Sequence, residues 1–126
     1  MRCSLRAGAC AAAVLGMFSA GLAQSYGAGA LAIGQCAAYG YAYDYPSIAA
    51  AETAARAKCT DGSCNQMVAA QKGCAAFAVD GHKPCGPNGY ANASRLGAAQ
   101  NAALKSCYKY GGKDCVIRAW ICDGKG

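Results

Sequence analysis

Tyrosines alternate with small or polar residues along the stretch YGYAYDY. A period of two predicts a β-strand whose successive side chains point to opposite faces. One face would carry Tyr39, Tyr41, Tyr43 and Tyr45. The other face would carry glycine, alanine and aspartate. A short apolar run before it, Ala30–Ile33, predicts an earlier strand of the same sheet.

A helix is predicted next, because strong helix formers, most of them alanine, fill the residues from Ile48 to Lys58. Ser47 stands directly before them and is a natural N-cap. Cys59 ends the helix and a polar turn follows. Cys64 then opens a third strand, which continues through 65–71.

The same order of elements recurs in the second half of the chain. Ala76–Val79 matches Ala30–Ile33, and Asn88–Ala93 matches the tyrosine strand with one aromatic retained, Tyr90. Ser94 repeats the N-cap of Ser47 before a second alanine-rich helix over 95–106. A last strand runs over 116–121. An internal duplication of this kind is stronger evidence for the architecture than the secondary-structure propensity of any single segment.

We therefore predict an α+β fold of two pseudo-symmetric β-β-α-β units, about 28–74 and 75–122. Neither unit can bury enough surface alone, since each has about fifty residues and one helix. We expect the units to share one antiparallel sheet with both helices on one side. The helices would lie against the alanine and glycine face, and the tyrosines would occupy the opposite face.

The first 23 residues have the features of a secretory signal peptide. Arg2 and Arg6 give a positive start, an apolar run covers 9–20, and a small-x-small site ends at Ala23. We expect cleavage near Ala23, leaving a single domain over 24–126 that is secreted or periplasmic. No other apolar stretch is long enough to span a bilayer.

Ten cysteines are present, and Cys3 and Cys10 belong to the signal. The remaining eight are Cys36, Cys59, Cys64, Cys74, Cys85, Cys107, Cys115 and Cys122. An even number in a small exported domain indicates a disulfide framework. Only one histidine is available and the spacings are not those of a zinc ribbon, so we expect no metal and no cofactor.

Equivalent positions in the two halves favour the local bridges Cys59–Cys64 and Cys107–Cys115. The other four cysteines can pair in two ways that respect the symmetry. Cys36–Cys85 with Cys74–Cys122 is the set that we prefer. Cys36–Cys74 with Cys85–Cys122 stays open at this stage.

The order Tyr41-Ala-Tyr-Asp-Tyr-Pro-Ser47, an alanine-rich helix ending in Cys59, then Cys64 and Cys74–Val79, resembles a known family. The family is the secreted bacterial domain of unknown function 4189, and the likeness covers roughly 28–122. The resemblance implies export from a bacterial cell and a cysteine-bridged domain. It brings no catalytic residues. Cys36 and Cys85 are additional to the six cysteines of the family pattern.

Loss of the signal lowers the net charge from +6 to +4, and the basic residues are scattered. A scattered mild charge excludes the footprint of a nucleic-acid reader and favours anionic surfaces. We expect a monomer whose partner is a protein or an envelope polymer, with no nucleic acid and no membrane span.

Two hypotheses about function follow from the side chains. The four tyrosines could form a stacking platform for sugars or for a protein partner, although core packing would also explain them. A non-enzymatic binding protein, an inhibitor or an envelope-associated factor would use that face, with the turn-rich loop around His82. Alternatively, a small hydrolase would use His82 as general base with Asp80 or Asp44.

Overall fold

The computed structural model describes residues 27–123, and the predicted signal peptide over 1–23 lies outside them. The elements follow one another in the order strand, strand, helix, strand, and then repeat it. They are β1 (Ala28–Ile33), β2 (Tyr39–Tyr45), α1 (Ile48–Ala57), β3 (Gln66–Gln71), β4 (Cys74–Asp80), β5 (Lys83–Ala93), α2 (Leu96–Lys109) and β6 (Cys115–Cys122). The α+β class and the two-unit order are confirmed.

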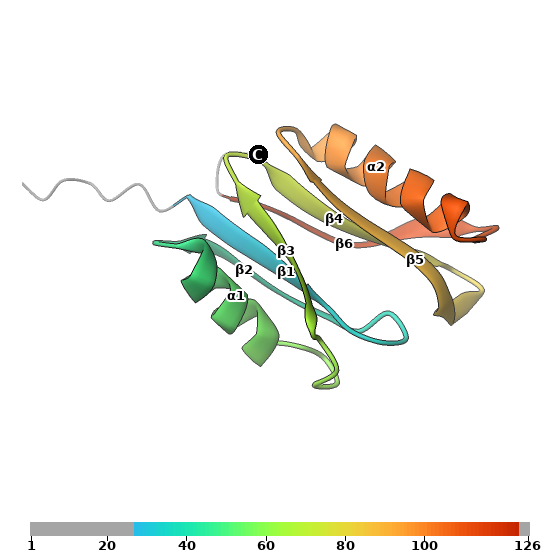
Figure 1. Cartoon of the computed structure of the whole chain (residues 1–126), viewed down its shortest axis with the longest axis horizontal. Coiled ribbons are helices and arrows are strands. Elements are labelled where there is room, and N and C mark those ends of the chain that lie inside the picture. Colours follow the sequence, from blue (N-terminus) through green and yellow to red (C-terminus); the bar gives the residue numbers. More distant parts are fainter. Residues whose placement is uncertain (1–26, 124–126) are drawn as a thin grey trace, which may run out of the picture.

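The two units do not share one sheet. The strands form two three-stranded antiparallel sheets, with the orders β2-β1-β3 and β5-β4-β6. Figure 1 shows the two helices on opposite sides of the molecule, with the strands between them. The expectation of a single sheet with both helices on one side was therefore wrong.

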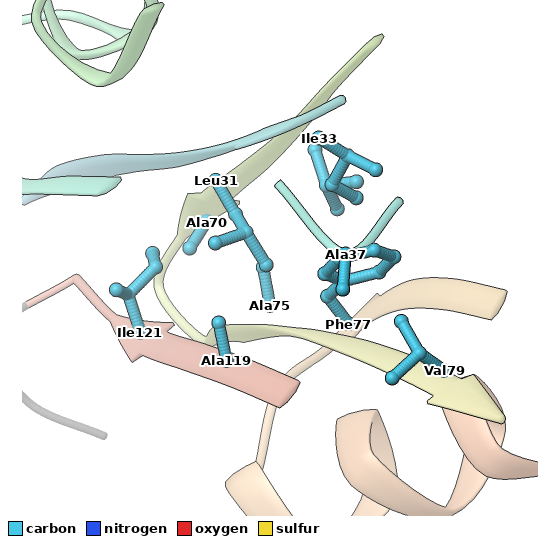
Figure 2. Close-up of a cluster of buried hydrophobic side chains, with 10 residues drawn as sticks. Leu31, Ile33, Ala37, Ala70, Ala75, Phe77, Val79, Ala119 and Ile121 are labelled. Atoms are coloured by element: carbon cyan, nitrogen blue, oxygen red, sulfur yellow. The ribbon is translucent and has the colours of Figure 1, made fainter. Parts of the chain in front are cut away.

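The reason lies in the alternation of small and large residues along the central strands. All residues of β1 and β4 are buried, so both faces of each sheet are covered. Leu31 and Ile33 of one sheet pack against Phe77 and Val79 of the other, as the cluster in Figure 2 shows. A single sheet with helices on one side would leave these large side chains in water, at a cost of roughly 1.5–3 kcal/mol each.

The opposite face of each sheet is lined by alanine and glycine, and a helix lies close against it. Ala51 and Ala55 of α1 pack on Ala30, Ala32 and Ala42. The second helix repeats the arrangement on its own sheet with Ala99 and Ala103. This confirms that the helices cover the small-residue faces.

Two equivalent glycines set the distance between helix and sheet. A Cβ on Gly40 would collide with the carbonyl oxygen of Ala55 and lie 2.7 Å from the Cys59 nitrogen. A Cβ on Gly89 would collide with the carbonyl oxygen of Ala103. The backbones therefore touch at the end of each helix, where Cys59 and Cys107 begin the local disulfides.

Four disulfides join all eight cysteines of the described residues, and the preferred pairing is confirmed. The bonds are Cys36–Cys85, Cys59–Cys64, Cys74–Cys122 and Cys107–Cys115. Cys74 begins β4 and lies opposite Cys122 on β6, so it belongs to the second unit rather than ending the first, and this bridge is inside the second unit. Cys36–Cys85 alone among the four connects the two units.

The helices begin differently. The hydroxyl of Ser47 accepts a hydrogen bond of 3.1 Å from the Ala50 amide, as a capping serine does. The second helix has Arg95 at its N-cap without a side-chain hydrogen bond, so the expectation that Ser94 caps it was wrong. Neither helix within 27–123 is long and apolar enough to cross a membrane.

Candidate functional site

Three of the tyrosines form a ladder along the face of β2 that looks toward the second sheet. The ring centroids of Tyr39 and Tyr41 are 6.4 Å apart with planes inclined by 17°, and those of Tyr41 and Tyr43 are 6.4 Å apart at 5°. Tyr39 is half-buried against the core between the sheets. Tyr41 and Tyr43 are 44% and 54% exposed, so most of the ladder is surface.

Tyr45 does not belong to the ladder. The pairing of β2 with β1 shifts between Ala28 and Ala30, where β2 contains an extra residue and Asp44 adopts a positive φ of 60°. An extra residue turns the next side chain to the other face of the sheet. Tyr45 accordingly packs with the α1 cluster. Its placement beside Tyr39, Tyr41 and Tyr43 was wrong because the alternation alone does not reveal the bulge.

The ladder forms one wall of a groove, and β6 forms the floor. The groove has a volume of about 910 Å³ and is lined by Tyr39, Tyr41, Tyr43, Leu96, Gln100 and residues 117–122. Trp120 is 51% exposed there. We call this surface the β2–β6 groove. It joins side chains from both units.

Arg118 of the second unit contacts Ala37 and Tyr39 of the first unit at one end of the groove. Its Nε donates a hydrogen bond of 3.1 Å to the carbonyl oxygen of Ala37, and its guanidinium lies 5.0 Å from the centre of the Tyr39 ring. A cation over an aromatic face is attracted by the ring quadrupole. The charge is therefore held at one end of the tyrosine ladder while Arg118 stays exposed.

His82 is not part of the groove lining but lies in the turn between β4 and β5. Its Nε2 is 2.6 Å from Oδ2 of Asp114, and both side chains are largely exposed. Neither of the two alternative partners expected for the imidazole, Asp80 or Asp44, forms this ion pair. Asp80 accepts hydrogen bonds from the amides of Lys113 and His82, at 3.1 and 2.9 Å. The imidazole thus meets Asp114, which the sequence did not suggest.

Asp44 lies at the other end of the sheets from His82. It precedes Tyr45, which pairs with Ala28 at the start of β1. The β4–β5 turn lies beyond the end of β1, where Cys36 is bonded to Cys85. A strand of six residues, about 20 Å, separates these ends.

The amide hydrogen bonds from Lys113 and then His82 lower the pKa of Asp80. In the loop between α1 and β3, the hydroxyl and then the amide of Ser63 lower the pKa of Asp61. Both carboxylates accept hydrogen bonds that hold their loops in place, and the lowered pKa keeps them ionised at neutral pH. Across residues 27–123 no group of three or more histidine, cysteine, aspartate or glutamate side chains is placed to hold a metal ion.

Sequence reasoning found the ladder but missed its partners on β6. Val116–Ile121 was expected to be a strand, yet Arg118 and Trp120 were not singled out. A signal existed. Trp120 is the one tryptophan of the chain and stands in a strand that opens and closes with cysteine. What the sequence could not give is that the edge of β6 lies beneath the tyrosines of β2.

Comparison with known proteins agrees with this fold. A family described as "Domain of unknown function (DUF4189)" matches residues 26–122. A solved structure, the NMR structure of Rv1813c from Mycobacterium tuberculosis, is similar with a TM-score of 0.56 and 27% identity, covering 77% of this chain and 75% of that one. A search of curated proteins found no match.

Proposed function

The chain belongs to the DUF4189 family, and starting from that membership we propose that it is an exported, non-enzymatic binding protein. The β2–β6 groove is its binding surface. The observation that carries the proposal is that the exposed Tyr41 and Tyr43, Trp120 and Arg118 line one groove of about 910 Å³.

The residue types of the groove suit recognition. Tyrosine, tryptophan and arginine dominate the binding energy of interfaces, since they combine large contact area with a polar end. Two exposed tyrosines and an exposed tryptophan on one side of a small domain are unlike the scattered apolar residues of an ordinary surface. The groove also contains no carboxylate among its lining residues, and hence no pair of acid and base.

Four disulfides in a domain of this size fit an oxidising compartment, outside the cell or in the periplasm. A signal over residues 1–23 with cleavage near Ala23 would deliver it there. In that compartment the partner would be a secreted or envelope protein or an envelope polymer. An inhibitor or an envelope-associated factor is a narrower form of the same function.

Trp120 makes the proposal directly testable, because it is the single tryptophan of the chain and lies in the groove. The protein used is the oxidised chain that starts at Gln24. Soluble envelope oligosaccharides and linear peptides are titrated into it while tryptophan emission is followed. We expect a saturable change that Tyr41→Ala/Tyr43→Ala abolishes.

The matched control is Tyr90→Ala/Tyr110→Ala, which removes two exposed tyrosines that line a separate hollow beside β5. It should bind as the parent does. His82→Ala should also bind normally. A ligand that is turned over, with turnover lost in His82→Ala, would replace this proposal by the hydrolase hypothesis.

A further inference from the structure

We infer that the β2–β6 groove binds an extended peptide carrying an acidic side chain, which adds to the open edge of β6 as a fourth strand. The inference rests on the proposed function and specifies its partner. Within residues 27–123, β6 pairs with β4 on one side and with no strand on the other. Its outer edge coincides with the floor of the groove.

Backbone groups of β6 point outward at defined residues. The Asp123 amide donates to the Gly73 carbonyl at 3.0 Å, so this pair is a hydrogen-bonded one. Hydrogen-bonded and non-hydrogen-bonded pairs alternate along an antiparallel ladder. The pairs Cys74–Cys122 and Ala76–Trp120 are then non-hydrogen-bonded, and their groups face away from each other. The N–H and C=O of Trp120 and Cys122 therefore point into the groove.

An added strand would find walls on both of its faces. Ala119 and Ile121 face the core between the sheets, and alternation turns Trp120 to the other face, where Leu96 and Gln100 of α2 also line the groove. The tyrosine ladder covers the first face. Alternate side chains of a peptide would thus meet the tyrosines or meet Trp120, as peptides do when they extend a sheet.

The spacing of the ladder fits an extended chain. Neighbouring ring centroids are 6.4 Å apart. Side chains on one face of a strand repeat about every 6.4–6.8 Å, since the rise is about 3.2–3.4 Å per residue. Each side chain on that face of the peptide would meet one tyrosine.

The equivalent position on the edge of the other unit is occupied by a side chain of the protein itself, which distinguishes it from the β6 edge at Trp120. Ala69 of β3 pairs with Ala30 as Trp120 pairs with Ala76. The Asn92 side chain donates its Nδ2–H to the Ala69 carbonyl oxygen at 3.1 Å. By the sequence match, Tyr43 takes the place of Asn92 beside β6. An outward carbonyl of β3 is thus bonded within the protein, while the matching place on β6 is bordered by aromatic side chains.

The positive charge in the groove favours an occupant with an acidic side chain. Arg118 is the only charged residue among the described residues that line it. A second copy pairing through β6 around a twofold axis would bring two Arg118 side chains together near the middle of the strands, and like charges facing each other are destabilising. A peptide with a glutamate or aspartate facing Tyr39 would instead meet an opposite charge.

The test uses the oxidised protein from Gln24 and a phage-displayed library of linear peptides about eight residues long, the length of an ordinary strand. We expect enriched peptides with period-two apolar residues and one acidic residue. Chemically synthesised, they should change Trp120 emission and slow amide hydrogen exchange at Trp120 and Cys122. Arg118→Glu should weaken binding about tenfold or more.

N-methylation of alternate peptide amides supplies a sharper control. Methylating the amides that bond β6 should abolish binding, while methylating the intervening amides should leave it nearly unchanged, since only one edge of the peptide pairs. Equal effects of both methylation patterns would overturn strand addition. So would an oligosaccharide that changes Trp120 emission without protecting these amides, although the proposed function would stand. If no peptide and no oligosaccharide binds in a manner that Tyr41→Ala/Tyr43→Ala abolishes, both fall.

Discussion

Asn92 on β5 and Tyr43 on β2 occupy matching positions in the two units, but Asn92 alone bonds the neighbouring sheet edge, with its Nδ2 3.1 Å from the Ala69 carbonyl oxygen. An amide side chain thus connects the units at β3. At β6 the corresponding position carries an exposed aromatic ring. The two units therefore differ at this matching edge position, which is bonded by a side chain on β3 and bordered by an aromatic ring at β6.

Removal of that hydrogen bond should lower stability without affecting the groove. Asn92→Ala is expected to reduce the free energy of unfolding by about 0.5–1.5 kcal/mol, the net value of one such bond. Guanidinium unfolding followed by circular dichroism measures it. Ligand titration of the same variant should match the parent. A variant with unchanged stability would show that the Asn92–Ala69 contact contributes nothing in solution.

The backbone contact between helix and sheet should be intolerant of a single methyl group. Gly40→Ala and Gly89→Ala each place a Cβ against helix backbone, and overpacking of this kind costs about 1–3 kcal/mol or more. Gly97→Ala is the matched control, because a Cβ there meets nothing within 4 Å. It should stabilise α2 by about 0.5–1 kcal/mol. Equal unfolding midpoints for the three variants would contradict the close packing.

The bulge at Asp44 predicts opposite phenotypes for neighbouring tyrosines. Tyr45→Ala removes a side chain packed against α1 and should cost about 1–3 kcal/mol of stability while leaving groove binding intact. Tyr43→Ala should weaken binding and change stability by less than about 0.5 kcal/mol. Paired denaturation and tryptophan-emission titrations separate the two effects. If Tyr45→Ala lost binding while its stability was unchanged, Tyr45 would belong to the binding face together with the other three tyrosines.

Stability should fall on acidification through the loops that Asp80 and Asp61 fix. Hydrogen bonds lower the pKa of both carboxyls in the folded state, so their contribution is complete above the unfolded pKa of about 4. It is lost as pH falls through the lower folded pKa. Thermal melts between pH 6 and pH 2 should show this decline, and Asp80→Asn should flatten it.

Much of the fold follows from the sequence because the duplication repeats every structural signal. The alanine helices, the cysteines that end them and the glycines opposite them recur in both halves, so the elements and the two local disulfides could be predicted, whereas the symmetry left two pairings open for the other four cysteines. The stacking of the two sheets does not follow from the duplication, but it has a signal in Ala30–Ile33 and Ala76–Val79, where large apolar side chains alternate with alanine and lie on the face away from the helix. Leu31 and Phe77 require a second apolar layer.

The candidate site was only half predictable for a related reason. Periodicity places side chains on the faces of one strand, and it gave Tyr39, Tyr41 and Tyr43. It says nothing about which strand edge lies under that face, so Arg118 and Trp120 went unnoticed. The bulge that turns Tyr45 to the other face depends on a positive φ at Asp44. Aspartate tolerates this conformation, but its presence in a strand does not predict it.

Amide and tryptophan side-chain shifts of the oxidised domain, recorded by two-dimensional NMR as a bound ligand is added, test the groove most directly. The account predicts that the largest changes fall on residues 39–43 and 117–122, including the Trp120 indole N–H. Changes concentrated at the turn of His82 and Asp114, or along β3 and β5, would contradict it.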